Sequence, residues 1–231
     1  MASAMKGETC YICGAPKVSD EHFPPKAFFP SDRRVRRKLK TVPSCKTHNN
    51  DKSDDDVYLL THISINAAAG DNLAKQVFLR SIEPNLTSPR FRAAITRGAQ
   101  ARPDGAVAYP VDVARFDNFF THLACAVYFD RYGESLDPNQ HSIAHVYLDL
   151  VSDDPAERQR NDWIAESVAF FTAEFSAMIS KYVAAKQKAV VYENRIMDPG
   201  GALASITIVH TFYGVFNVVS LLTKKGIIGQ R

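Results

Sequence analysis

The sequence has no long run of apolar residues and no segment of low complexity. Its most apolar stretch, residues 212–222, is short and interrupted by polar residues, whereas a membrane-spanning helix needs about 20 apolar residues. The N-terminal residues contain no apolar core of the kind that a secretory signal requires. These absences predict a cytoplasmic protein with no membrane segment, and the lack of an internal repeat argues against a repeat architecture.

Cysteine is scarce, and its placement is informative. Of the 4 cysteines, Cys10 and Cys13 form one close pair, and Cys45 is followed shortly by His48. Two close pairs of such ligands, separated by a longer loop, are typical of a structural zinc site rather than of disulfides. The sequence therefore predicts a zinc ion held by Cys10, Cys13, Cys45 and His48. The fourth cysteine, Cys125, lies in an apolar segment and is expected to be buried.

Residues 1–60 contain few large apolar side chains and many prolines and charges. A segment of this size buries too little surface to fold without additional stabilisation. A structural zinc ion supplies roughly 10–16 kcal/mol of apparent binding free energy to such a fold. We therefore expect residues 1–60 to form a zinc-stapled module. Because four protein ligands leave no position for a substrate, any chemistry must come from other side chains.

Charge is distributed unevenly along the chain. Residues 1–52 hold 11 Lys/Arg and 5 Asp/Glu, a net charge of +6, whereas residues 53–231 hold 17 and 20, a net charge of −3. A local positive excess favours a polyanionic partner, although a solvated loop or helix face is the alternative interpretation of the basic run. The candidate contacts to nucleic-acid phosphates are Arg33, Arg34, Arg36, Arg37, Lys38, Lys40 and Lys52.

Three elements of the sequence together resemble the HNH endonuclease family, whose members have the ββα-metal, or His-Me finger, fold. These elements are the Cys10/Cys13 pair, Glu21-His22-x-Pro24, and Cys45-x2-His48-Asn49-x2-Lys52. The resemblance spans residues 10–56. It implies that the zinc-stapled module is a ββα-metal nuclease domain in a setting such as restriction or phage defence. DNA is the substrate that the resemblance favours, and RNA is the alternative.

The resemblance also implies a role for each residue beside the zinc site. His22 would be the general base that activates the attacking water. Glu21, directly or through water, and Asn49 would bind a catalytic Mg²⁺ or Mn²⁺ ion at the scissile phosphate. Phosphodiester hydrolysis needs an activated water and stabilised charge on the phosphoryl oxygens, which an imidazole and a hard cation with oxygen ligands supply.

Two departures from the family pattern leave other interpretations open. His48 stands where the family usually has a cysteine, and zinc accepts this change. Lys40 stands where the family has the asparagine that orients the catalytic histidine, so a backbone carbonyl or Thr41 would have to orient His22. The alternative function is a non-catalytic zinc module that binds nucleic acid or protein. The alternative role of Asn49 is that of a helix N-cap.

Residues 61–231 are expected to form a mostly helical α+β body, which makes the whole chain α+β. Helical patterns cover residues 49–60, 71–82, 91–100, 111–132 and, as the longest, 155–188. Strand patterns cover residues 145–151, 189–197 and 202–222, the last as a strand pair or one bent strand. The body contains no motif with a known chemistry. Its role is open between substrate recognition, sensing of an activating ligand and formation of a homo-oligomer.

Overall fold

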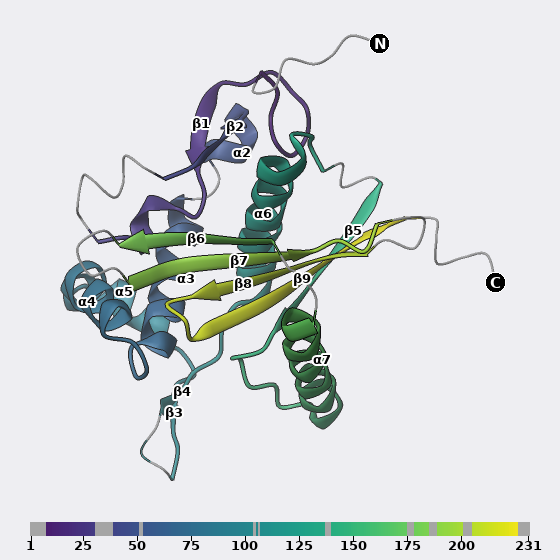
Figure 1. The fold of residues 1–231 in the computed structure, drawn as a ribbon. Coiled ribbons are helices and arrows are strands. Elements are labelled where there is room, and N and C mark those ends of the chain that lie inside the picture. The colour runs from purple at the N-terminus through teal and green to yellow at the C-terminus, as the bar shows by residue number, and fades with distance from the viewer. Residues whose placement is uncertain are drawn as a thin grey trace, which may run out of the picture.

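The computed structural model describes residues 8–30, 39–50, 53–103, 105, 107–136, 140–174, 178–184, 189–200 and 205–225. The predicted α+β class is confirmed. A small N-terminal hairpin and helix lie beside a set of helices and a five-stranded antiparallel sheet (Figure 1). Among the described residues, every helix is either too short or too polar to span a membrane.

The elements are named in chain order in Figure 1. The helices are η1 (Lys26–Phe28), α2 (Lys46–Asn50), α3 (Ser53–Ala67), α4 (Asn72–Ser81), η2 (Glu83–Thr87), α5 (Pro89–Thr96), α6 (Val113–Tyr132) and α7 (Pro155–Glu174). The strands are β1 (Ser19–His22), β2 (Thr41–Ser44), β3 (Gln100–Ala101), β4 (Val107–Ala108), β5 (His141–Tyr147), β6 (Met178–Ala184), β7 (Ala189–Met197), β8 (Ser205–Phe212) and β9 (Phe216–Lys224).

The large sheet has the strand order β5-β9-β8-β7-β6, with antiparallel neighbours. Successive residues of a strand point to opposite faces of the sheet. In this protein a different helix covers each of the two faces. Ile208 and Val218 belong to the buried cluster that includes the apolar side of α6. Their neighbours Val209 and Val219 belong to a second cluster, against which Ile164 of α7 packs. The sheet therefore lies between α6 and α7.

Helix α6 is the central helix of the molecule, and its ends and apolar side follow from the sequence. The side chain of Asp112 caps its N-terminus, and Gly133 ends it in the left-handed conformation, with a φ of 73°. Phe116, Phe120 and Leu123 recur at helical spacing and are buried. The helix predicted over residues 111–132 is thus confirmed.

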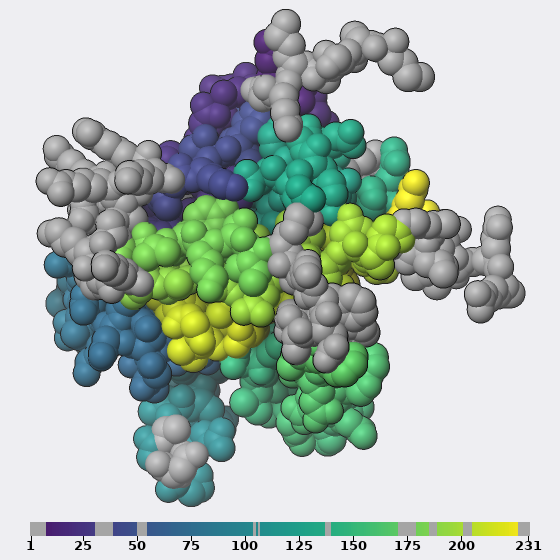
Figure 2. All heavy atoms as spheres, in the orientation of Figure 1, coloured from purple at the N-terminus to yellow at the C-terminus, as the bar shows by residue number. Residues whose placement is uncertain are grey.

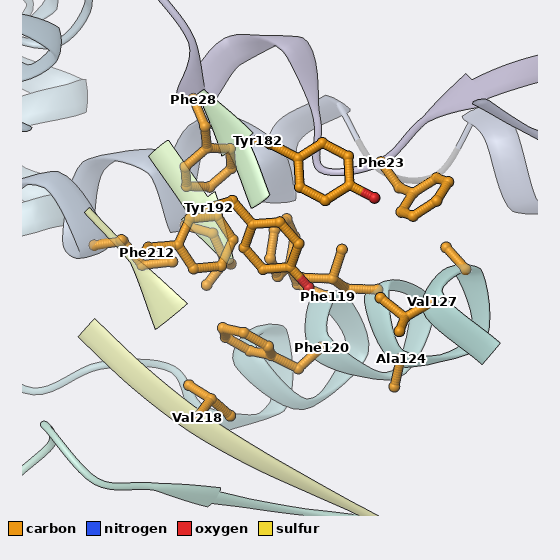
Figure 3. Packing of buried hydrophobic residues seen from close by; sticks show 14 of the residues in the cluster. Phe23, Phe28, Phe119, Phe120, Ala124, Val127, Tyr182, Tyr192, Phe212 and Val218 are labelled. Carbon is orange, nitrogen blue, oxygen red and sulfur yellow. The ribbon is translucent and has the colours of Figure 1, made fainter. Parts of the chain in front are cut away.

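The N-terminal part and the sheet share one hydrophobic core, shown in Figure 3. Phe28 of η1 packs against Phe119 of α6 and Phe212 of β8, with ring centroids 5.7 and 4.8 Å apart. The ring of Phe23 contacts that of Tyr182 in β6, at a centroid distance of 6.0 Å. The domain boundary at residue 60 remains a prediction. Helix α3 continues through that position, and the buried cluster extends on both sides of it.

The helix predicted over residues 155–188 is wrong in its second half. Helix α7 ends at Glu174, and β6 follows it and pairs with β7. The predicted helix extends to residue 188 because Met178 and Tyr182 follow its apolar residues at helical spacing. Their spacing of four residues is also a multiple of the strand period of two. Tyr182 is buried and its neighbours Lys181 and Val183 are exposed, which is the alternation expected of a strand.

The other predicted elements agree more closely with the structure. The helix over 71–82 and the strand over 189–197 are confirmed as α4 and β7, and residues 202–222 contain the strand pair β8 and β9. A tight turn with positive φ at Tyr213 and Gly214 joins the pair. The predicted helix over 91–100 ends at Thr96, and the predicted strand over 145–151 starts earlier, at His141.

Candidate metal centre and its surroundings

The four predicted zinc ligands come from two short segments that the fold brings together. Cys10 and Cys13 lie in a tight turn, which the Gly14 N–H closes by donating to the Cys10 carbonyl at 3.0 Å. Gly14 has a φ of 69°, which glycine adopts without strain. Cys45 immediately precedes α2, and His48 lies within this helix. The hairpin β1–β2 and the start of α2 therefore position one half of the site.

The ligand atoms converge on one point. The Sγ atoms of Cys10 and Cys45 each lie 3.3 Å from Nδ1 of His48. The Sγ atoms of Cys13 and Cys45 are 3.8 Å apart, and all four ligand atoms lie within 4.8 Å of one another. With Zn–S near 2.3 Å and Zn–N near 2.0–2.1 Å, the ligand atoms of a tetrahedral site are roughly 3.6–3.8 Å apart. The Cys3His cluster of Cys10, Cys13, Cys45 and His48 is thus consistent with a structural zinc ion.

The surroundings of Cys45 favour the thiolate form that zinc requires. Burial raises the pKa of this thiol, but hydrogen bonds from the backbone of His48 and from the thiols of Cys10 and Cys13 lower it below its ordinary value. Within the part of the chain that the structure describes, no second group of three or more His, Cys, Asp and Glu side chains approaches this closely.

Tyr11, between the first two cysteines, connects the zinc cluster to Glu21 and α6. Its side chain is fully buried. Its hydroxyl donates to Oε2 of Glu21 at 3.0 Å and lies 3.1 Å from Nδ1 of His122. Because the phenol gives its single proton to Glu21, Nδ1 of His122 must donate to the phenol oxygen. Burial, followed by the charge of Glu21, raises the pKa of Tyr11, so the hydroxyl remains protonated.

His122 also supports the zinc cluster itself. Its ring meets that of His48 edge to face, with centroids 5.7 Å apart. Beyond α6, the Ser135 hydroxyl donates to the carbonyl of Cys10 at 2.8 Å. The sequence predicted no role for Tyr11 or His122, because the hydrogen bond between them joins residues 111 positions apart. Spacing along the chain gives no signal for such a contact.

Glu21 and His22 are neighbours in β1, and successive residues of a strand point to opposite faces. Glu21 is turned towards Tyr11, on the side of the zinc cluster. His22, at the end of the strand, is half-buried. Burial and the charge of Lys26 lower the pKa of His22, and Asp20 and Glu21 offset only part of this effect. The imidazole is therefore uncharged at neutral pH.

The groups expected to orient His22 are placed less favourably. Thr41 lies opposite His22 in the hairpin, and the Lys40 carbonyl accepts a hydrogen bond from the Phe23 N–H at 3.2 Å. This carbonyl is thus already part of the hairpin. Among the described ranges of the chain, no hydrogen bond to the His22 ring is found.

Asn49 lies on the exposed side of α2, directly after His48 of the Cys3His cluster. Helix α2 packs against β1, so Asn49 belongs to the same small unit as Glu21 and His22. Its backbone N–H donates to the carbonyl of Cys45 within the helix. Asn49 is therefore inside α2, and the alternative that it caps a helix N-terminus is wrong.

Most of the predicted phosphate contacts lie outside the described residues: Arg33, Arg34, Arg36, Arg37, Lys38 and Lys52. Lys40 is described. Its Nζ lies 2.6 Å from a carboxylate oxygen of Asp130 in α6, and both side chains are partly exposed. This ion pair ties the hairpin to α6.

Comparison with known proteins finds no match to this chain. No protein-family model matches it, and neither a curated protein nor a solved structure does so. The resemblance to the HNH family therefore depends on the residues named above and on their arrangement around the Cys3His cluster.

Proposed function

We propose that the N-terminal part of the chain is a metal-dependent endonuclease of the HNH type, which hydrolyses phosphodiester bonds in DNA. The observation that carries the proposal is the order of elements around the Cys3His cluster. The first strand of a hairpin ends at His22, and the helix after the second strand begins beside Cys45 and carries Asn49. A ββα-metal nuclease is expected to have this order of strand, strand and helix.

In this proposal the zinc ion is structural, since four protein ligands occupy its coordination positions. His22 accepts the proton of the attacking water. Asn49 would hold a magnesium or manganese ion, which would stabilise charge on the phosphoryl oxygens. Glu21, which points to the opposite face of β1 from His22, would bind this ion through water. The hydrogen bond from Tyr11 to Glu21 supports this role, because carboxylates that bind metals are commonly held in orientation by a second partner.

The charge distribution supports nucleic acid as the substrate. The net charge of +6 over residues 1–52 coincides with the proposed catalytic unit. Arg and Lys contacts to phosphates provide affinity without reading sequence, so they suit an enzyme that must hold a backbone in place.

The proposal is tested by incubating zinc-loaded protein and supercoiled plasmid DNA with Mg²⁺ or Mn²⁺. We expect nicked or linear DNA, and a loss of rate of about 10²–10⁴-fold for His22→Ala, because the general base is removed. Zinc content and thermal stability should be unchanged in this variant. The matched control is His141→Ala, which alters a histidine of β5 outside the proposed site and should cleave at the wild-type rate. Equal rates for wild type and His22→Ala would reject the proposal.

One observation favours a second candidate, a non-catalytic zinc module that binds nucleic acid. The His22 ring has no hydrogen-bond partner among the described residues, and Lys40 replaces the asparagine that orients it in the HNH family. If zinc-loaded protein retains DNA in a mobility-shift assay but does not cleave it with either ion, the second candidate is correct.

A further inference from the structure

A cleft of about 480 Å³ lies between α7 and the face of the large sheet that α7 covers. Helix α7 lies below the strands of this sheet in Figures 1 and 2. Small-molecule sites have volumes of about 300–1,000 Å³. The described lining residues all lie within residues 148–217, so the cleft is separate from the Cys3His cluster and from the hairpin that carries His22.

Small side chains on α7 leave this space open. Ile164 packs against the cluster of buried valines that includes Val209 of β8. Ala165 comes one residue later, about 100° further around the helix, and Ala169 lies one turn beyond it on the same side. Both alanines line the cleft with only a methyl group, and Val190 of β7 lines it as well. The walls of the cleft are therefore largely apolar.

The sheet side of the cleft carries a cluster of charged side chains. Glu193 of β7 has a side chain only 11% exposed, and its Oε1 accepts a hydrogen bond from Nε of Arg195 at 2.7 Å. Nζ of Lys181, on the neighbouring strand β6, lies 3.0 Å from Oε2 of Glu193. Burial raises the pKa of Glu193, but Arg195 and Lys181 lower it below its ordinary value, so the carboxylate is charged at neutral pH.

Arg195 lines the cleft and retains unused hydrogen-bond donors. Within the described part of the chain, its Nε alone makes a hydrogen bond. Glu193 orients the guanidinium group through this bond, and the two terminal amino groups remain for another partner. Since the Arg195 side chain is 35% exposed, these groups can be reached from the cleft.

The charged cluster favours an anion of low charge. Lys181 and Arg195 contribute two positive charges and Glu193 one negative charge, a net charge of +1. Asp149 lies farther away, because it bonds to Asn217 of β9, which is two strands, or roughly 10 Å, from β7. A single negative charge beside Arg195 would therefore balance the cluster.

We propose that this cleft binds a monocarboxylate with an apolar chain. The carboxylate accepts hydrogen bonds from the terminal amino groups of Arg195, and the chain lies between Ala165 and Ala169 of α7 and Val209 of the sheet. Arginine suits this ligand because its planar group binds a carboxylate through two parallel hydrogen bonds. This inference goes beyond the proposed nuclease activity and does not depend on it.

The test is isothermal titration of the full-length, zinc-loaded protein with octanoate, 1-octanol and octylamine. These probes share one straight chain, and their head groups are anionic, neutral and cationic. We expect octanoate to bind saturably and roughly tenfold or more tightly than the other two. Arg195→Gln should remove this preference for octanoate, because it removes the charged donors. The matched control is Arg92→Gln, an exposed arginine of α5 outside the cleft, which should bind as wild type does.

A second variant tests the apolar wall. Ala165→Leu fills part of the cleft without changing any charge, and leucine is well suited to a helix. We expect it to weaken the binding of octanoate and of octanol alike, by about tenfold. The matched control is Ala156→Leu, the same substitution in the exposed first turn of α7, which should have no effect. Far-ultraviolet circular dichroism checks the fold of each variant.

Three outcomes would overturn the proposal. Octanoate does not bind at millimolar concentration, so the cleft holds no such ligand. Octylamine binds as tightly as octanoate, so the cluster does not select an anion. Either Arg195→Gln or Ala165→Leu binds octanoate as tightly as wild type, so the ligand occupies another place.

Discussion

The hydroxyl of Tyr11 is shared by Glu21 and His122 in a position closed to solvent. Each of the three groups is a hydrogen-bond partner of another. Leaving a buried polar group without its partner lowers the free energy of unfolding by about 1–3 kcal/mol. Because His122 also packs against His48 of the Cys3His cluster, this trio couples the cluster to α6. We therefore expect the stability of the Cys3His cluster to depend on these hydrogen bonds as well as on a bound metal.

Replacing Tyr11 with Phe removes only the shared hydroxyl. We expect the free energy of unfolding to fall by about 1–3 kcal/mol, measured by urea denaturation of the zinc-loaded protein, with no change in zinc content. In the double variant Tyr11→Phe/Glu21→Ala the two losses should overlap, because both remove the same hydrogen bond. Strict additivity of the two single effects would show that the bond contributes nothing.

A second group of buried polar side chains lies inside the large sheet. Nδ1 of His210 is 2.7 Å from the Tyr192 hydroxyl, and the Ser220 hydroxyl lies 3.0 Å from Nε2 of His210 and 2.9 Å from Nδ1 of His145. Burial, together with the neighbouring His145, lowers the pKa of His210 to about 3. Burial lowers that of His145 to about 4, although Asp117 offsets part of this effect.

These two histidines should make the protein sensitive to acid. Their folded-state pKa values lie below the value of about 6.5 in an unfolded chain, so the unfolded state binds more protons below that pH. We expect the free energy of unfolding to fall between about pH 6.5 and 4, by up to about 1.4 kcal/mol per pH unit for each histidine. Chemical denaturation at several pH values should show a smaller slope for His210→Gln. An identical slope would mean that His210 is not buried uncharged.

At the scale of secondary structure, we expect α2 to depend on a bound metal. It is a single short helix, and its start is fixed by Cys45 and its middle by His48. We expect Cys45→Ser to lose zinc and to lower the melting temperature of the whole protein, since the zinc ion that links the two ligand segments is no longer held. His48→Cys should retain one zinc per chain, because zinc accepts four thiolates. Elemental analysis and thermal scans test both, and a normally folded, zinc-free Cys45→Ser protein would contradict this account.

The sequence predicts the elements whose apolar repeat, capping residues or ligand spacing can be recognised within a short segment of the chain. The apolar repeat and caps of α6 lie within the helix itself, and the ligand spacing of the Cys3His cluster is equally local. Strand β6 could not be predicted, because the apolar spacing of Met178 and Tyr182 suits a helix as well, and pairing with β7 decides between them. The hydrogen-bond partners of Tyr11 likewise depend on segments that only the folded chain brings together.

At the scale of the whole molecule, the N-terminal part and the sheet are joined through Phe28. Its ring lies between rings of α6 and β8, and its carbonyl accepts a hydrogen bond from the Tyr213 hydroxyl at 2.8 Å. A core that continues across both parts favours cooperative unfolding.

We therefore expect zinc release and loss of the sheet to occur at the same urea concentration. Phe28→Ala should move both transitions together, with a loss of about 3–5 kcal/mol, because it leaves a cavity in the shared core. A colorimetric zinc indicator and circular dichroism, recorded on the same samples, measure the two events. Two separate midpoints would show that residues 1–60 unfold independently.

Helix α6 contacts both the buried imidazole of His62 on α3 and the Cys3His cluster. Phe116, near its first turn, lies 6.2 Å from the ring of His62, and His122 lies against His48. Only about 9 Å of helix axis separates these two residues. A rigid rod of this length transmits a displacement at one end to the other.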